Sequence, residues 1–68
     1  MKKINQEIKK LMKIYWRYRL IITNEKIELK ITPKSNKENE INWIVDNDED
    51  GKYDLFYSLQ KLSYKNGL

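Results

Sequence analysis

The sequence contains no cysteine and no histidine. The side chains that most often serve as nucleophile, general base or transition-metal ligand are therefore missing, and no disulfide can cross-link the chain. We expect a protein that is not an enzyme. The lack of cysteine and of a signal-peptide apolar segment also predicts a cytoplasmic location.

Long apolar runs are missing as well. The longest one, Leu20 to Ile22, is far too short to cross a bilayer. The 68 residues suffice for one domain, residues 1–68, with a small core. Alanine is absent whereas lysine, asparagine and isoleucine are abundant, a bias typical of AT-rich genomes, so part of the net charge of +4 can follow from base composition. A small chain with this bias fits a phage or mobile-element regulator.

Apolar and polar side chains alternate along both halves of the stretch Ile14 to Thr32. A period of two is typical of strands with one buried face. A turn at residues 24–25 forms a hairpin in which Leu20 lies opposite Leu29, and the alternate apolar side chains of both strands share this face. We therefore predict a hairpin, with Trp16 among its core side chains.

Before the hairpin, apolar residues recur at helical spacing. Ile4, Ile8 and Leu11 fall on one side of a helix, and lysines occupy most of the remaining positions. This pattern predicts an amphipathic helix that ends near Lys13. The same series continues into the hairpin, so one long helix to Thr23 is the alternative, but the aromatic and β-branched residues there favour a strand.

After the hairpin, Pro33 ends the second strand, and the polar residues 34–40 predict a mobile loop. Alternation from Ile41 to Val45 predicts a third strand. Trp43 falls on its apolar face, and we expect this side chain in the core.

The sequence of the C-terminal segment is compatible with either a helix or a strand. Leu55, Leu59 and Leu62 have helical spacing, and the basic last turn before Asn66-Gly67 is typical of a helix end. A fourth strand from residues 52 to 59 is the alternative. We favour the helix, with Phe56 in the core, and predict a single α+β domain of the order α-β-β-β-α, in which a helix lies on one face of a small antiparallel sheet.

Every aspartate of the chain lies within nine residues, at the spacing D-x-D-x-D-G-x-x-D. These residues are Asp46, Asp48, Asp50 and Asp54. The spacing resembles the calcium loops of EF-hands and of integrin-type propeller repeats, and the resemblance implies a calcium site. Tyr57 stands where an EF-hand has its bidentate glutamate. The second interpretation is therefore a solvated turn, with Asp54 as the N-cap of the final helix.

The outer face of the predicted hairpin is basic and aromatic. It would carry Tyr15, Arg17, Arg19, Lys30 and Lys34. The predicted register sets Arg19 directly opposite Lys30, and such a like-charge pair costs stability unless an anionic group binds there. Aromatic side chains beside arginine and lysine are how sheet surfaces stack bases and hold phosphates. The structural interpretation is a solvated surface that protects a sheet edge.

Charge is unevenly distributed along the chain. Residues 1–34 hold ten basic against three acidic side chains, and residues 35–68 hold four against seven. This separation favours a small adaptor or inhibitor that docks on a macromolecular partner, a protein or a protein–nucleic acid complex. Its basic surface would lie on the hairpin and the first helix. Its acidic surface would comprise Asp46, Asp48, Glu49 and Asp50.

Other functions remain open from the sequence. A nucleic-acid-binding module that uses the basic face of the hairpin is the main alternative, and calcium-stabilised folding is the third. The lysines of the first helix could also contact an anionic membrane, which we disfavour because its apolar side carries no large aromatic residue before Tyr15. The sequence also allows a homo-oligomer.

Overall fold

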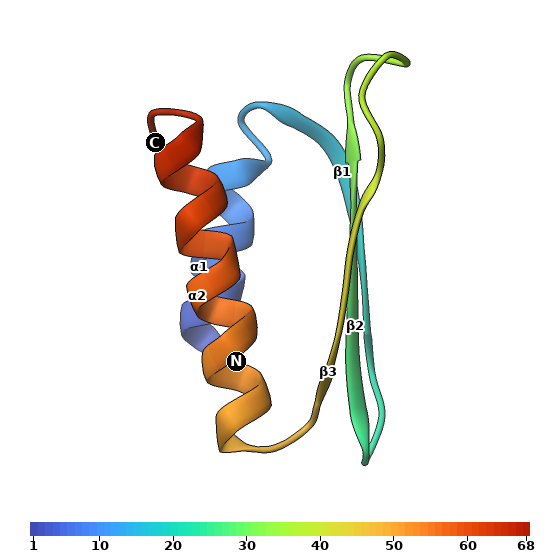
Figure 1. Ribbon diagram of the computed structural model, residues 1–68, viewed down its shortest axis with the longest axis vertical. Coiled ribbons are helices and arrows are strands. Elements are labelled where there is room, and N and C mark those ends of the chain that lie inside the picture. The colour runs from blue at the N-terminus through green and yellow to red at the C-terminus, as the bar shows by residue number, and fades with distance from the viewer.

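The computed structural model describes residues 1–68 and confirms the α-β-β-β-α order. The elements are α1 (Lys2–Leu11), β1 (Tyr15–Ile22), β2 (Lys26–Pro33), β3 (Ile41–Asp46) and α2 (Glu49–Lys65). The strands form one antiparallel sheet in the order β1-β2-β3, and both helices lie on the same side of it (Figure 1). The structure is therefore a two-layer α+β domain. Neither helix has the combination of length and apolar character that crossing a membrane requires.

The hairpin has the predicted register. Leu20 lies opposite Leu29, and the pairs on either side of it follow as expected. Its turn is closed by Thr23, whose N–H donates to the carbonyl oxygen of Lys26 at 2.9 Å and whose hydroxyl oxygen accepts the N–H of Lys26 at 3.0 Å. β3 then pairs with the other edge of β2, so that Trp43 lies opposite Leu29. The helix-facing residues of the three strands are therefore aligned with one another across the sheet.

The bounds of both helices differ from the predicted ones. α1 ends at Leu11, two residues before Lys13. α2 begins at Glu49, so the predicted N-cap at Asp54 was wrong, as was the alternative of a fourth strand. The carboxylate of Asp48 caps α2 instead, because it accepts the N–H of Gly51 at 2.7 Å. Two acids in the first turn then favour the helix start through its dipole.

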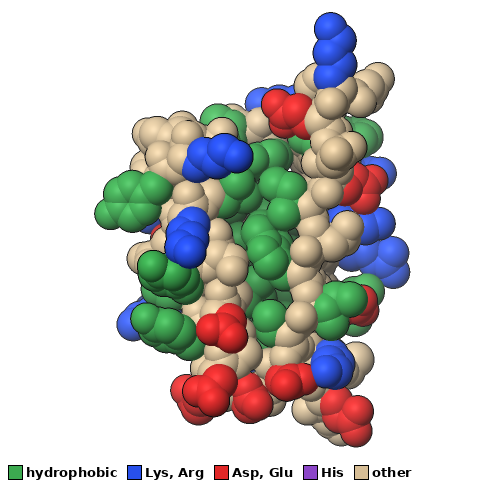
Figure 2. Space-filling model, viewed as in Figure 1, with side chains coloured by type: hydrophobic (Ala, Val, Ile, Leu, Met, Phe, Trp, Pro, Cys, Tyr) green, Lys and Arg blue, Asp and Glu red, His purple; other side chains and the backbone are tan.

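The core lies between the helices and the sheet, where apolar side chains fill the space between the two layers (Figure 2). Its fully buried members are Ile8, Leu11, Ile27, Leu29, Ile31, Leu55 and Leu59. The first turn of α2 approaches the end of β3 so closely that a Cβ atom at Gly51 would overlap the carbonyl oxygen of Asp46. Glycine is required there for space rather than for an unusual backbone angle.

A β-bulge changes the faces of two aromatic residues at the start of β1. The register shifts between Tyr15, which pairs with Pro33, and Arg17, which pairs with Thr32. Trp16 is the extra residue. Tyr15 therefore turns toward the helices and is only 8% exposed, whereas Trp16 is 61% exposed. The predictions that Tyr15 lies on the outer face and Trp16 in the core were both wrong.

The two other aromatic residues expected in the core fit better. Trp43 and Phe56 are half-buried and pack against the buried cluster. Helical spacing and strand alternation are regular around these two residues. The error at Trp16 is thus confined to the one place where an irregular strand breaks the alternation.

Candidate functional site

The candidate site is the outer sheet face, which we define as the side of the sheet turned away from the helices. Register places Arg17, Arg19 and Ile21 of β1 on this side, beside Thr32, Lys30 and Glu28 of β2 and Asn42 and Ile44 of β3. Trp16 joins them through the bulge. No helix covers this face (Figure 1). Its side chains are therefore free to contact another molecule.

Trp16 and Arg17 form one unit on this face. The guanidinium carbon of Arg17 lies 4.3 Å from the centroid of the Trp16 ring, which is a cation–π arrangement. At an exposed site such a contact contributes about 0.5–1 kcal/mol, which favours this mutual arrangement of the two side chains. The pair presents a flat aromatic ring beside a positive charge, and the part of its ordering already present in the free protein need not be lost on binding.

The two arginines of β1 have no carboxylate partner. The ion pairs of the protein are Lys10–Glu7, Lys26–Asp46 and Lys30–Glu40, at 3.0, 2.5 and 3.4 Å. Arg19 lies directly opposite Lys30, as the hairpin register predicted. Glu40 approaches Lys30 and relieves part of this repulsion. Arg17 and Arg19 therefore keep uncompensated charge on the outer sheet face.

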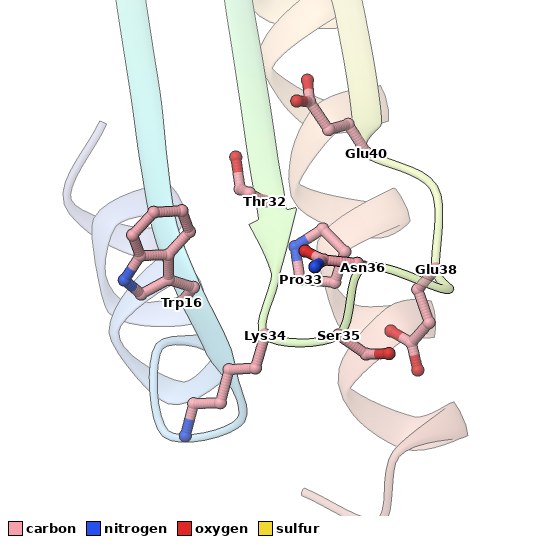
Figure 3. A pocket seen from close by; sticks show the side chains of 8 residues that line it. All are labelled: Trp16, Thr32, Pro33, Lys34, Ser35, Asn36, Glu38 and Glu40. Atoms are coloured by element: carbon pink, nitrogen blue, oxygen red, sulfur yellow. The ribbon is translucent and has the colours of Figure 1, made fainter.

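An open cleft of about 570 Å³ lies at the upper end of this face. Figure 3 shows the indole of Trp16 on one side of it, Pro33 at its centre, and the loop that carries Glu38 on the other side. Lys34 also lines the cleft, but its ammonium group lies 3.5 Å from the carbonyl oxygen of Lys13 and so ties the loop to the α1–β1 connection. The cleft has an aromatic wall facing an acidic one.

The predicted basic site is thus only partly assembled. Arg17, Arg19 and Lys30 lie together on the outer sheet face, and Lys34 lies at its margin. Tyr15 is excluded by the bulge. Trp16 takes its place, a residue that we had placed in the core. The signal that could have shown this is the pair of adjacent aromatic residues, only one of which fits an alternating core.

The predicted acidic surface lies at the lower end of the molecule, where red side chains gather in Figure 2. Its residues also have structural roles. Asp46 pairs with Lys26, Asp48 caps α2, and Glu49 and Asp50 lie in the first turn of that helix. Because capping and dipole interactions account for these carboxylates, the segment is less suited to docking than the outer sheet face.

The structure does not assemble the calcium ligands implied by the aspartate spacing. Asp50 and Asp54 lie within α2, and Asp48 points to the N–H of Gly51. No three acidic side chains come together in a way that could hold a metal ion. Calcium binding stays a prediction, and it requires a melting temperature that rises with millimolar calcium and falls again with a chelator.

Comparisons with known proteins add no functional information. No family model, no curated protein and no solved structure matches the chain. The candidate site is therefore argued from the chemistry and geometry of its own residues.

Proposed function

We propose that the protein is a non-enzymatic adaptor or inhibitor that docks its outer sheet face onto an acidic surface of a partner protein. The observation that carries this proposal is the Trp16–Arg17 unit, exposed on β1 beside the unpaired Arg19. Tryptophan and arginine are the residues most enriched among those that dominate binding energy at protein interfaces.

The rest of the outer sheet face has the composition of an interface. Ile44 is 64% exposed and Ile21 is 36% exposed, on either side of Glu28, so β1 and β3 each offer apolar contact area. Charged side chains surround these residues. An acidic partner would meet Arg17 and Arg19, which would raise the association rate and fix orientation, while the apolar residues would supply contact area.

The test compares partner capture by matched variants. The chain is immobilised and exposed to an extract of cells that express it, and bound proteins are quantified by mass spectrometry. Trp16→Ala/Arg17→Ala/Arg19→Ala removes one aromatic residue and two charges from the outer sheet face. The control, Tyr64→Ala/Lys2→Ala/Lys9→Ala, likewise removes one aromatic residue and two positive charges, from exposed positions on the helices.

We expect a protein that the wild-type chain and the control capture equally and that the outer-face variant loses by at least tenfold. A partner that both variants retain, or both lose, contradicts the proposal. Binding of the purified partner is then followed in a Trp43→Phe variant, in which Trp16 is the sole tryptophan. Protection of its fluorescence from acrylamide quenching would place the contact at the outer sheet face.

Nucleic acid is the second candidate partner for the same face. The favourable observation is that the indole of Trp16 is exposed beside two unpaired arginines, because bases stack on aromatic side chains of sheets while cations hold the phosphates. Against it, Glu28, Glu38 and Glu40 lie on or beside the same face. The regularly spaced phosphates of a nucleic acid would meet these carboxylates, whereas a protein can place its acidic side chains opposite Arg17 and Arg19 alone.

Fluorescence polarisation of labelled single- and double-stranded DNA and RNA separates the two candidates. Nucleic-acid binding predicts an affinity that falls steeply with salt, and a salt slope that drops by about two in Arg17→Ala/Arg19→Ala. The variant Lys2→Ala/Lys9→Ala makes the same change in net charge and should keep the slope. No binding at low salt removes this candidate and leaves the protein partner.

A further inference from the structure

The strand β1 leaves one edge of the sheet unpaired. It bonds only to β2, whereas β2 has a neighbour on both sides. The N–H of Thr23 donates to the carbonyl oxygen of Lys26, and hydrogen-bonded pairs alternate with non-bonded pairs along an antiparallel ladder. The bonds to β2 therefore come from Arg17, Arg19 and Ile21. The intervening residues Tyr18, Leu20 and Ile22 direct their N–H and C=O groups to the free edge.

These same three residues also have unburied side chains on the helix-facing side. Tyr18 is 47% exposed and Ile22 is 51% exposed, although their partners on β2, Ile31 and Ile27, are completely buried. Leu20 is half-buried. The helices cover β2 and β3 but stop short of this stretch of β1. Backbone groups and apolar side chains are thus left unpartnered at one place.

The stretch is complementary to itself. In an antiparallel pair with a two-fold axis at Leu20, Leu20 lies opposite its own copy and Tyr18 lies opposite Ile22 of the other chain. Each of these pairs can exchange two backbone hydrogen bonds and brings apolar side chains together. On the outer side, Arg19 then lies opposite Ile21 of the second copy. No arginine faces another arginine directly.

The two neighbouring registers for pairing β1 with a second copy are less favourable. If one copy slid by one residue along the other, its apolar side chains would face the outer side of the sheet. The two copies can therefore slip only by two residues at a time. One such slip sets Arg19 opposite Arg19 of the other copy, which is a like-charge pair. The opposite slip leaves Tyr18 facing Asn24 in the turn. The two-fold at Leu20 is the register that satisfies both backbone and side chains.

The other sheet edge lacks this property. The helix-facing residues of β3, such as Trp43 and Val45, already pack against the core beneath α2. The outward positions of β3 are Asn42, Ile44 and Asp46, and Asp46 is held by Lys26. Pairing at β3 would therefore bring together less exposed apolar surface on the helix-facing side than pairing at β1.

We propose that a second copy of this chain docks on β1, with antiparallel pairing centred on Leu20, to form one continuous sheet twice as wide. The interaction is isologous and closes at the dimer, because both copies use the same edge and each β1 is then paired. This inference does not rest on the proposed function of the outer sheet face. It does place two Trp16–Arg17 units on one surface.

Cross-linking tests the register. The chain has no cysteine, so a single engineered one is unique. In Leu20→Cys the two Cα atoms would lie about 5.5 Å apart, and a short reagent with two thiol-reactive alkylating groups should give a covalent dimer in high yield. In Tyr18→Cys the two copies would be about 13 Å apart along the strands and should cross-link at least fivefold less. Ile44→Cys, on the opposite edge, should stay uncross-linked.

Sedimentation provides the second measurement. The wild type should approach twice the monomer mass of 8.3 kDa as its concentration rises. Tyr18→Lys/Ile22→Lys sets lysine against lysine across the seam at exposed positions, and it should sediment as a monomer with an unchanged circular dichroism spectrum. A wild type that stays monomeric at several hundred micromolar overturns the proposal. So do equal yields from Leu20→Cys and Tyr18→Cys, or a sedimenting mass of the wild type that keeps rising beyond the dimer, which would indicate open strand addition.

Discussion

The strands β1 and β2 present the same kind of side chain to the same side of the sheet, yet their burial differs. Ile27 and Ile31 of β2 have no exposed surface, whereas Ile22 and Tyr18, directly opposite them, are about half exposed. Strand alternation therefore shows which face a side chain is on. Where the helices lie shows whether that face is covered.

The largest expected difference between the two strands is at Leu29 and Leu20, which lie opposite each other. Leu29 is 1% exposed at the centre of the core. Leu29→Ala should lower the free energy of unfolding by about 4 kcal/mol, because it leaves a cavity. Leu20→Ala should cost less than half as much. Urea denaturation of both variants measures the difference, and equal losses would show that the edge strand is as well covered as the centre.

The start of β1 is an exception to this comparison, because the bulge buries one of two adjacent aromatic residues. Tyr15→Ala should cost about 3 kcal/mol through lost packing. Trp16→Ala should change stability by less than about 1 kcal/mol, as expected for a surface position. Thermal unfolding of the two variants gives the ranking. The reverse order would mean that the strand is regular and the two side chains have exchanged faces.

The burial of the β2 side chains depends on how closely α2 approaches the sheet. Gly51→Ala forces the first turn of α2 away from the carbonyl oxygen of Asp46 and should cost about 2 kcal/mol, despite the better helix propensity of alanine. Lys52→Ala, one residue further along α2, should be nearly neutral. The urea midpoints of the two variants decide this, and a stabilised Gly51→Ala would show that the contact is loose.

The smallest expected effect concerns the exposed end of β2. The hydrogen bond to Asp46 and the charge of Asp46 raise the pKa of Lys26 above its ordinary value of 10.5. A pKa that is higher in the folded state stabilises the protein below the unfolded value and ceases to do so as the pH rises through the folded one. The melting-temperature advantage of wild type over Lys26→Met should therefore be full below pH 10.5 and vanish as the pH rises beyond that value. Lys9→Met, which removes a lysine without an ion pair, should show no such pH-dependent change.

Much of the fold was accessible from the sequence because its patterns are local and regular. The hairpin register around Leu20, the third strand and the C-terminal helix all follow from periodicity and end signals. The start of α2 was misplaced because several acids in a row offer competing caps, and Asp48 is selected by where β3 ends. Which of these acids becomes the N-cap of α2 is decided by tertiary contacts.

The candidate site was less accessible. Arg17, Arg19 and Lys30 could be placed together because they lie in the regular part of the hairpin. The exchange of Tyr15 for Trp16 could not be foreseen, since a bulge changes facing by one residue and leaves no distinct signal in composition. Half-exposure of Tyr18 and Ile22 likewise depends on the reach of the helices, which alternation does not encode.

The bulge at Trp16 also allows one residue to be gained or lost during evolution without disturbing the rest of the hairpin. From Arg17 onward, the hairpin is held in place by the turn at Thr23 and by pairing with β2, so the gain or loss of one residue at the bulge leaves the faces of these positions unchanged. Deleting Trp16 would regularise the strand and remove the largest aromatic side chain from the outer sheet face. A single codon at this point can therefore change the side chains that the outer sheet face presents without redesigning the interior.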